Sequence, residues 1–511
     1  MPDLTPTPGG TAELAAFAAL QARLPQLFRR VFADPLAPRT VVVVPGLSVD
    51  EEVLGKVLGC QHYEERQLSM LMLLRLRNTR LVFLSSTPLE PAIVDYHLRL
   101  LDDVPLDDAR QRLVLLSASD GSAQSLTRKI VERPRLIERI RAATGDPQLA
   151  HLSVFNSTAL ERMLAVQLGI PLYGCDPNLL EWGGKSGSRR AFREAGIGLP
   201  DGVEDLRDVH DLVAALAELK GRRPGLARAV VKLNFGFSGE GNAVFSYAGC
   251  PEEDTARWIA AHLPLNLALE ARDLGWDRYA AKLGEQGGIV EEWLSGDGLR
   301  SPSVQMRINP LGELEYVSTH DQILGGPSGQ IFQACTFPAD PAYAGEIQAL
   351  AARVGAVLKA KGVLGRFGVD FVSLPRERGW QHHAIEINLR KGGTTHTFQM
   401  LQFLTRGHYE RERAEFLTPA GERRCYYATD NVVNPVYRRL TPQDLFEIAA
   451  QRDLRYDPDG QRGVTFGLVG ALAEFGKLGM VAIDATPEAA RRRFRNAVAV
   501  LEEEAAKPPV A

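Results

Sequence analysis

The stretch Ile385-Glu386-Ile387-Asn388-Leu389-Arg390 alternates apolar and polar side chains, which is the pattern of a β-strand. Glu386 and Asn388 therefore point to the same side, and Arg390 joins them if the strand continues. A second strand is predicted at residues 368–373 and carries Asp370. If the two strands are neighbours, Asp370 meets Glu386 and Asn388.

Two carboxylates and an amide oxygen form a hard, oxygen-only ligand set. Such a set suits Mg²⁺ that is shared with phosphate oxygens, and it suits zinc poorly. The alternative is a solvated face of an antiparallel sheet. Apolar residues flank Asp370, Glu386 and Asn388 on both strands, and the otherwise apolar sheet favours the metal-site hypothesis.

A lysine in a strand precedes a glycine-rich loop. Residues 229–233 are predicted to form a strand with Lys232, and residues 243–247 return as the second arm of a hairpin. A buried lysine is costly unless it meets an anion, and glycines let backbone N–H groups approach a phosphate closely. The alternative is an ordinary hairpin whose lysine reaches water. The loop between the two arms contains Gly236, Ser238, Gly239 and Gly241.

Two other segments are ambiguous when taken alone. Lys185 opens a helix predicted at residues 184–193, where it could be an ordinary basic first turn. Glu291 and Glu292 lie in a strand predicted at residues 289–294, where glutamates usually indicate an edge or a solvated face.

Two polar loops could contact substrates. Residues 391–396 form a flexible turn after Arg390, and together they could hold a phosphoryl group or a substrate carboxylate, or simply close the strand. Residues 320–329 are rich in glycine and polar side chains and could form a lid, or an ordinary surface loop.

The composition excludes several classes of protein. The chain has 511 residues, of which 45% are hydrophobic and 24% charged, and its net charge is −4. This length suggests about three domains of roughly 150 residues. The near-neutral charge gives no basic surface for nucleic acid and no membrane signal, and no apolar run approaches the roughly 18 residues that span a bilayer. The five widely spaced cysteines lack CxxC spacing, which favours reduced thiols in the cytoplasm.

The predicted elements divide the chain into four parts. Residues 1–34 form an N-terminal lead, and its first residues, MPDLTPTPGGT, indicate a short disordered segment and not a signal peptide. Residues 35–175 alternate continuous apolar runs with helices, one of them at residues 63–77, which predicts a doubly wound α/β domain. Paired strands and glycine-rich turns follow in residues 176–410. Residues 411–511 indicate a small α+β domain.

Strands and a closing helix are predicted in the last part. Apolar runs occur at residues 464–473 and 479–483, with a hairpin turn at residues 476–479 between them. Thr486 is the predicted N-cap of the closing helix, and Pro487 its first residue.

Taken in order, these features resemble the ATP-grasp superfamily over roughly residues 176–410. The hinge at residues 291–296 resembles that of D-alanine–D-alanine ligase. The whole chain is similar to the pheganomycin-type peptide ligases, which have an α/β domain before the ATP-grasp fold and an added C-terminal domain. The closer similarity rests on His62-Tyr63-Glu64-Glu65-Arg66, Lys129 with Arg133-Pro134-Arg135, Gly184-Lys185-Ser186-Gly187-Ser188-Arg189, Thr319-His320-Asp321-Gln322 and residues 386–395.

The resemblance implies a nucleotide site. Lys185 and Lys232 would contact the phosphates of ATP, beneath the loop at residues 236–241. Glu291 and Trp293 would lie beside the adenine, with Glu291 accepting from its amino group. The backbone from Glu292 to Leu294 would donate to the ring. D-alanine ligases carry a glutamate for the ribose a few residues later, where Asp297 is the nearby candidate.

The resemblance also implies a reaction. Asp370, Glu386 and Asn388 would hold Mg²⁺, and Arg390 and Lys232 would be the catalytic residues. ATP would convert a carboxylate into an acyl phosphate, and an amine would displace the phosphate to form a peptide or amide bond. The substrates would be a small carboxylate and an amine, such as amino acids or peptides.

Two other activities are compatible with these residues. An ATP-grasp phosphotransferase, of the inositol-phosphate kinase type, would need a basic pocket for a phosphorylated acceptor. A nucleotide-binding scaffold without turnover would usually have lost a phosphate-contacting lysine or a metal ligand. The sequence leaves the oligomeric state open, with a homo-oligomer among the options.

Overall fold

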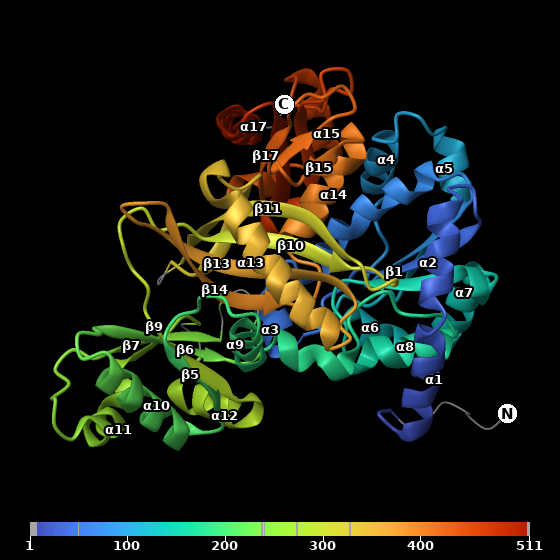
Figure 1. Ribbon diagram of the computed structural model, residues 1–511. Helices are drawn as coiled ribbons and strands as arrows, with labels where there is room; N and C mark the ends of the chain where they lie inside the picture. The colour runs from blue at the N-terminus through green and yellow to red at the C-terminus, as the bar shows by residue number, and fades with distance from the viewer. Residues whose placement is uncertain are drawn as a thin grey trace.

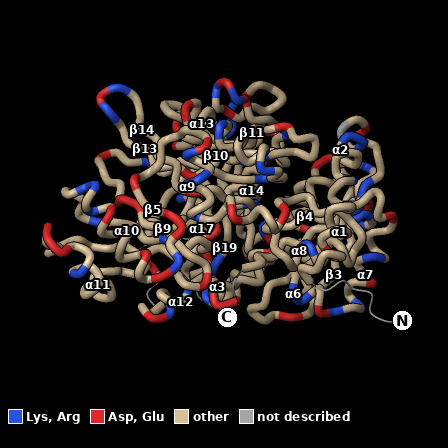
Figure 2. The backbone as a smooth tube through the Cα atoms, turned by 60° about the horizontal axis from the view of Figure 1, so that its bottom comes forward, with Lys and Arg blue, Asp and Glu red and all other residues tan. Residues whose placement is uncertain are grey.

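The computed structural model describes residues 8–49, 51–236, 239, 241–271, 274–326 and 329–507 (Figure 1). A parallel sheet lies near the N-terminus, and two larger antiparallel sheets and a short antiparallel strand pair follow in the described part of the chain. Acidic and basic residues are interspersed over all of these parts (Figure 2). No helix in the described ranges is long and apolar enough to cross a membrane.

The N-terminal sheet confirms the predicted doubly wound domain. Its four parallel strands have the order β3-β2-β1-β4 and coincide with the apolar runs of the sequence. The strands are β1 (Arg39–Val44), β2 (Thr79–Ser85), β3 (Leu113–Ser117) and β4 (Ala150–Val154). The helices around them are α3 (Glu51–Lys56), α4 (Pro91–Arg99), α5 (Leu106–Arg112), α6 (Leu126–Val131), α7 (Pro134–Thr144), η2 (Pro147–Leu149) and α8 (Ala159–Leu168).

Two segments near the N-terminus differ from the sequence prediction. Most of the predicted lead is helical, as α1 (Thr11–Gln21) and α2 (Leu24–Ala33), and Phe17 packs in the same hydrophobic cluster as β1. The helix predicted at residues 63–77 is a 3₁₀ helix, η1 (Cys60–Arg75). Glu64 to Leu71 are all buried, so η1 is enclosed on every side and not only along one stripe.

The smaller antiparallel sheet has the order β5-β9-β6-β7-β8. The predicted hairpin is confirmed, since β6 pairs with β7 and places Lys232 opposite Asn242. The strands are β5 (Gly202–Leu206), β6 (Arg228–Leu233), β7 (Asn242–Ser246), β8 (Leu267–Leu269) and β9 (Gly288–Glu292). The helices that precede or cover this sheet are η3 (Pro177–Gly183), α9 (Lys185–Glu194), α10 (Val209–Arg222), α11 (Thr255–Asn266) and α12 (Trp276–Gln286).

In the described part of the chain, the larger antiparallel sheet has the strand order β14-β13-β10-β11-β12-β17-β19-β18. β12 pairs with β17, so the sheet continues across residue 411, where the sequence suggested a domain boundary. The strands are β10 (Pro302–Ile308), β11 (Leu314–Gly325), β12 (Ile331–Phe337), β13 (Gly365–Pro375), β14 (Trp380–Asn388), β17 (Cys425–Val433), β18 (Gly463–Gly467) and β19 (Lys477–Asp484).

The remaining elements flank this sheet. The predicted closing helix is confirmed, with the Thr486 side chain as its N-cap and Pro487 as its first residue. The elements are α13 (Pro341–Ala360), α14 (Gly393–Thr405), β15 (His408–Glu410), β16 (Glu415–Leu417), η4 (Pro435–Arg439), α15 (Pro442–Gln451), α16 (Ala471–Phe475) and α17 (Pro487–Ala506).

Three local predictions are wrong. His320 to Gly325 belong to β11 and pair with β10 or β12, so this part of the expected lid is strand. The polar turn after Arg390 becomes α14 at Gly393. The strand expected at residues 464–473 ends at Gly467. Helix α16 connects it to β19, so most of the turn expected at residues 476–479 is already part of β19.

The two flanking parts of the chain share one core. A single hydrophobic cluster contains residues of β1 and β2 together with residues of β17, β18, β19 and α17. Figure 1 shows α4 beside α15, where the Tyr96 and Phe446 rings stack with centroids 4.4 Å apart. The N-terminal domain is therefore held against the C-terminal strands.

Phe337 tests this shared core. Its ring is fully buried and stacks on Tyr426 of β17 with centroids 4.9 Å apart. We expect Phe337→Ala to lower the free energy of unfolding by about 3–5 kcal/mol, because it leaves a cavity. Chemical denaturation measures this loss. The control Leu265→Ala, at a side chain 84% exposed, should change it by less than about 0.5 kcal/mol; equal effects would contradict the shared core.

Candidate active site

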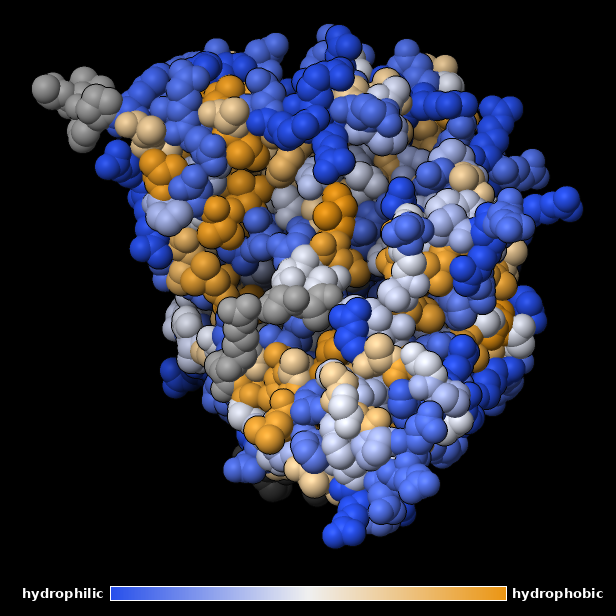
Figure 3. All heavy atoms as spheres, turned by 90° about the vertical axis from the view of Figure 1, so that its left-hand side faces the viewer, coloured by the Kyte–Doolittle hydropathy of each residue, from blue (hydrophilic) through white to orange (hydrophobic). Residues whose placement is uncertain are grey.

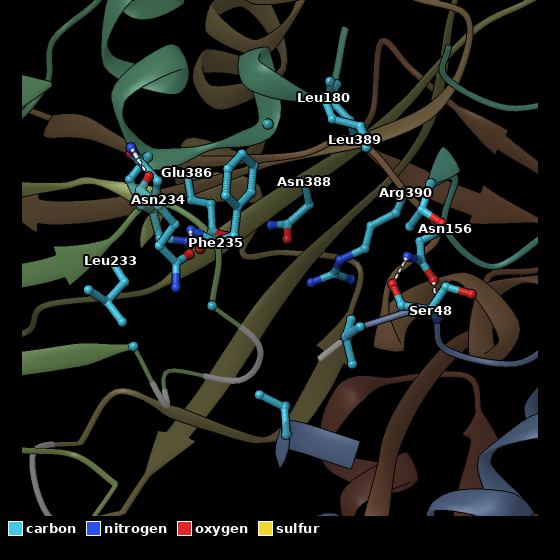
Figure 4. A pocket seen from close by; sticks show the side chains of 18 of the residues that line it. Ser48, Asn156, Leu180, Leu233, Asn234, Phe235, Glu386, Asn388, Leu389 and Arg390 are labelled. Carbon is cyan, nitrogen blue, oxygen red and sulfur yellow. Dashed lines mark hydrogen bonds and ion pairs between the residues drawn. The ribbon is translucent and has the colours of Figure 1, made fainter. Parts of the chain in front are cut away.

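A cavity of about 590 Å³ lies between the two antiparallel sheets and opens on the hollowed face seen in Figure 3. Most of the residues proposed from the sequence line it. They are Lys185, Lys232, Gly236, Gly239, Glu291, Glu292, Trp293, Leu294, Asp370, Glu386, Asn388 and Arg390. Gly241 lines an adjoining cavity of about 340 Å³, shown in Figure 4. Asp297 is exposed and lines neither cavity, and Ser238 lies outside the described residues.

The strand register brings the predicted metal ligands together. Asp370 of β13 lies opposite Glu386 of β14. The Nδ2 of Asn388 donates to one oxygen of Asp370 over 3.0 Å, and the Nε2 of Gln322 donates to the other over 2.9 Å. Figure 4 shows Glu386 and Asn388 of β14, and Arg390 just after the end of that strand, directed toward a common space. Gln322 was part of a quoted motif but had no role assigned, because its contact with Asp370 depends on β11 lying two strands away from β13.

The charges around this pair fit a cation. Removal from water would raise the pKa of Glu386, but Lys185, which forms an ion pair with it, and Arg390 outweigh this effect and lower the pKa. The pKa of Asp370 is raised, first by burial and then by the charge of Glu386. A divalent cation would stabilise the negative charge of both carboxylates and so offset the cost of burying them. The Nδ2 of Asn388 is bonded to Asp370, which leaves the Oδ1 of the same amide as a further ligand. The oxygen set therefore fits Mg²⁺.

A buried ion triad holds the second lysine. The Nζ of Lys232 lies 2.6 Å from one oxygen of Glu291, and the Nη1 of Arg189 lies 2.6 Å from the other. Glu291 is 1% exposed. Burial would raise its pKa, but the charges of Lys232 and Arg189 lower it. Both carboxylate oxygens of Glu291 thus have cationic partners, which differs from the expected contact with an adenine amino group.

Arg189 was part of a quoted motif but had no role assigned. It lies four residues after Lys185 in α9, a spacing that places both side chains on the same side of the helix. That spacing is the signal that could have identified it.

Asn234 links the two lysines. Its backbone oxygen accepts from the N–H of Lys185 over 3.1 Å, and its side-chain Oδ1 accepts from the N–H of Ser186 over 2.9 Å. Asn234 follows Lys232 at the end of β6, so it fixes the start of α9 next to that strand. Asparagine is a common partner for the unpaired N–H groups of a helix start. The resemblance implied that Lys185 and Lys232 lie near the same phosphates, but it did not identify Asn234 as the residue that joins the two segments.

The backbone after β9 leaves one donor for a ligand. The N–H of Glu292 donates to Asp201 over 2.8 Å, and the N–H of Trp293 donates to Arg228 over 3.3 Å. Among the described residues, the N–H of Leu294 has no acceptor. The indole of Trp293 lies 4.5 Å from the guanidinium of Arg228, which fixes the ring at the cavity wall.

Comparisons with known proteins agree with this geometry. A family model described as IQCH-like, ATP-grasp, matches residues 252–412, and one described as PGM1 C-terminal domain matches residues 444–496. L-propargylglycine–L-glutamate ligase of Streptantibioticus cattleyicolor is 31% identical over 492 residues, which cover 95% of this chain and 98% of the relative. IQ motif-containing protein H of Danio rerio is 22% identical, and the match covers 92% of this chain and 49% of that protein.

Solved structures with the same fold include nucleotide complexes. The ADP complex of N5-carboxyaminoimidazole ribonucleotide synthetase has a TM-score of 0.51 at 15% identity, covering 92% of this chain and 98% of the other. The biotin carboxylase domain of the Hydrogenobacter thermophilus 2-oxoglutarate carboxylase, with MgADP, ADP and bicarbonate, has a TM-score of 0.52 at 14% identity, covering 90% and 89%. These likenesses concern the fold.

The ion triad gives a stability prediction. Glu291→Gln should lower the free energy of unfolding by about 3–5 kcal/mol, because Arg189 and Lys232 lose the charge that balances them in a buried site. Glu181→Gln is the control. Glu181 is 59% exposed and pairs with Arg190, so its substitution should cost about 1 kcal/mol or less. Denaturant titration compares the two variants, and similar losses would show that the triad is not structural.

Proposed function

The chain belongs to the pheganomycin-type ATP-grasp ligases, and from that premise we propose how its cleft joins a carboxylate to an amine. It is an ATP-dependent enzyme that forms C–N bonds between small molecules. The observation that supports the assignment of the steps most directly is that the charged and amide side chains proposed for the site line one cavity. These residues are Lys185, Lys232, Asp370, Glu386, Asn388 and Arg390.

We assign the nucleotide to the side of the cavity formed by β6 and β9. The adenine would lie against Trp293, and the N–H of Leu294 would donate to its ring. Lys232 and Lys185 would contact the phosphates, which would compete with Glu291 and Glu386 for their charge. Glu291 then orients Lys232 instead of binding the adenine amino group.

Asp370, Glu386 and Asn388 would hold Mg²⁺. When bound, the ion would coordinate phosphate oxygens of ATP and offset the charge of the transferring group. Gln322 and the strand register keep Asp370 oriented toward Glu386. Lys185 neutralises Glu386 in the structure as described, and a bound metal would release that lysine toward the phosphates.

The chemical steps follow from the poor leaving group of a carboxylate. A carboxylate oxygen attacks the γ-phosphorus, the bond to ADP breaks, and an acyl phosphate forms. The amine attacks the carbonyl carbon, inorganic phosphate leaves, and the nitrogen loses a proton. Arg390 would stabilise the negative charge that develops on the acyl phosphate and on the tetrahedral intermediate. The other groups contribute by holding the reactants in position.

We propose amino acids as both substrates. The relative named above joins L-propargylglycine and L-glutamate by its name, and its match covers almost all of both chains. A cytoplasmic location and the lack of nucleic-acid and membrane partners remain predictions from the sequence, which leaves the oligomeric state open.

An amino-acid panel tests this function. Purified protein, ATP and Mg²⁺ should release phosphate and give a dipeptide mass with at least one amino-acid pair. Lys232→Ala should lower kcat/KM by about 100-fold, because a charge that contacts the reacting phosphate is lost. The exposed Lys359→Ala serves as the control and should stay near the wild-type value. A phosphorylated product without condensation would instead support the phosphotransferase.

Metal binding can be measured without turnover. Mn²⁺ replaces Mg²⁺ at many oxygen sites and can be titrated into the ADP-loaded protein by electron paramagnetic resonance. Glu386→Gln should weaken Mn²⁺ binding by about tenfold or more, since a charged ligand is lost. Glu377→Gln, in the exposed turn between β13 and β14, should leave it unchanged. Equal affinities of the two variants would remove Glu386 from the metal site.

A further inference from the structure

Another part of the main cavity is lined by cations from distant segments. Arg66 of η1 is 6% exposed and Lys477 of β19 is 4% exposed, and both line the cavity that contains Arg390. The guanidinium groups of Arg66 and Arg390 lie 4.8 and 6.0 Å from the centre of the Phe155 ring. We call the part of the cavity bounded by Arg66, Lys477 and the start of α14 the cationic pocket.

The charges of this pocket are not balanced. Asp430 accepts from Arg66 over 3.4 Å and from His396 over 3.0 Å, so one carboxylate serves both. Lys477 donates to the hydroxyl of Tyr63 over 2.9 Å, and it has no carboxylate partner among the described residues. Buried cations are usually paired with carboxylates. Here Asp430 pairs with Arg66 and Lys477 has only a hydroxyl partner, so the pocket has an excess of positive charge.

A donor of Arg66 is also unused. Its Nε donates to the backbone of Tyr63 and its Nη1 to Asp430, but its buried Nη2 has no hydrogen-bond partner in the described part of the chain. A buried donor without an acceptor costs about 1–3 kcal/mol, so native proteins rarely keep one without a reason. The side chain of Arg66 lines the cavity, so a ligand oxygen would satisfy this donor once the guanidinium turns toward it.

The start of α14 adds donors to the same wall. Gly392, Gly393 and Thr394 line the cavity, and α14 is 13 residues long. The N–H groups of Gly393 and Thr394 have no acceptor among the described residues. The first N–H groups of a helix and its dipole favour an anion at this position.

We propose that the cationic pocket binds a carboxylate of an amino-acid substrate, one that is not converted to the acyl phosphate. This inference rests on the proposed function. The phosphates of ATP are assigned to Lys185 and Lys232, on the side of the cavity formed by β6 and β9. This assignment leaves Arg66 and Lys477 for a different anion. The planar guanidinium of Arg66 matches the geometry of a carboxylate. In the sequence, Arg390 stands between Asn388 of the proposed metal site and Gly393 at the start of α14, which bounds this pocket.

The pocket also gives the C-terminal strands a function. Lys477 and Asp430 belong to β19 and β17, and they reach the cavity because the large sheet continues beyond β12. Arg66 and Tyr63 come from the N-terminal domain. A substrate held here would therefore contact all the main parts of the chain, and its remaining carboxyl group would lie near Arg390.

Calorimetric titration of the full-length protein, loaded with a non-hydrolysable ATP analogue and Mg²⁺, tests the pocket without turnover. The probes are L-glutamate, L-alanine, their α-carboxamides, L-glutamine and inorganic phosphate. We expect at least one of the two amino acids to bind, and replacement of its spectator carboxylate by an amide to weaken binding by about tenfold or more, through the loss of charge-assisted hydrogen bonds. The α-carboxamides and L-glutamine distinguish the α-carboxylate from the side-chain carboxylate of glutamate.

Two variants and a control complete the test. Arg66→Lys keeps the charge but removes the planar fork, and Lys477→Met keeps the length of the side chain but removes the charge. Each variant should lower the affinity for the amino acid by about tenfold, while the affinity for the ATP analogue should change by less than about twofold. The exposed Arg77→Met should behave as wild type. Unfolding curves identify any variant that fails to fold, and the other variant then decides.

The outcomes separate the pocket from the activity. Binding of neither amino acid, tighter binding of phosphate than of either amino acid, unchanged affinity in the variants, or a loss confined to the ATP analogue would overturn the pocket. Amino-acid binding that depends on Arg66 and Lys477, with no phosphate release from ATP, would support the pocket and contradict the ligase mechanism. Turnover with no effect of these variants on the amino acid would contradict only the pocket.

Discussion

Buried charge that must be neutralised is the constraint on which the cleft depends. Lys232 is held by Glu291, which Arg189 shares, and Lys185 is held by Glu386. These pairs connect helix α9 to strands of both antiparallel sheets, so they fix the lysines before any nucleotide arrives. A buried lysine without an anion is costly, so each lysine needs a partner whether or not ATP is bound. When ATP binds, its phosphates would take the place of the carboxylates beside the lysines, and a divalent cation would take the place of the lysine beside Glu386.

The large sheet extends this constraint to the rest of the chain. β14 and β13 carry the proposed metal ligands at one end, and β17, β19 and β18 complete the sheet at the other. The N-terminal domain packs on those last strands, and its motif at residues 62–66 places Tyr63 and Arg66 against Lys477 and Asp430. The flanking regions thus help to form the cavity as well as to cover it.

Local patterns in the sequence predicted the strands and much of the site. Alternation in residues 385–390 placed Glu386 and Asn388 on one face, and the register to Asp370 confirms their proximity. The partners of Glu291 could not be predicted from its strand, because Arg189 arrives from a helix about a hundred residues earlier. The continuation of the sheet through β12 and β17 was missed for the same reason, because long-range pairing leaves no local pattern. A strand with many polar residues, such as β11, also resembles a loop.

The transfer of oxygen from substrate to phosphate tests the acyl phosphate mechanism most directly. The carboxyl group of the amino acid that is activated would be labelled with ¹⁸O, and the phosphate released during ligation would be analysed by mass spectrometry. Attack by that carboxylate on the γ-phosphorus predicts one ¹⁸O atom in each phosphate, because the C–O bond of the acyl phosphate breaks when the amine attacks. Dipeptide formation that leaves the phosphate unlabelled would contradict the mechanism.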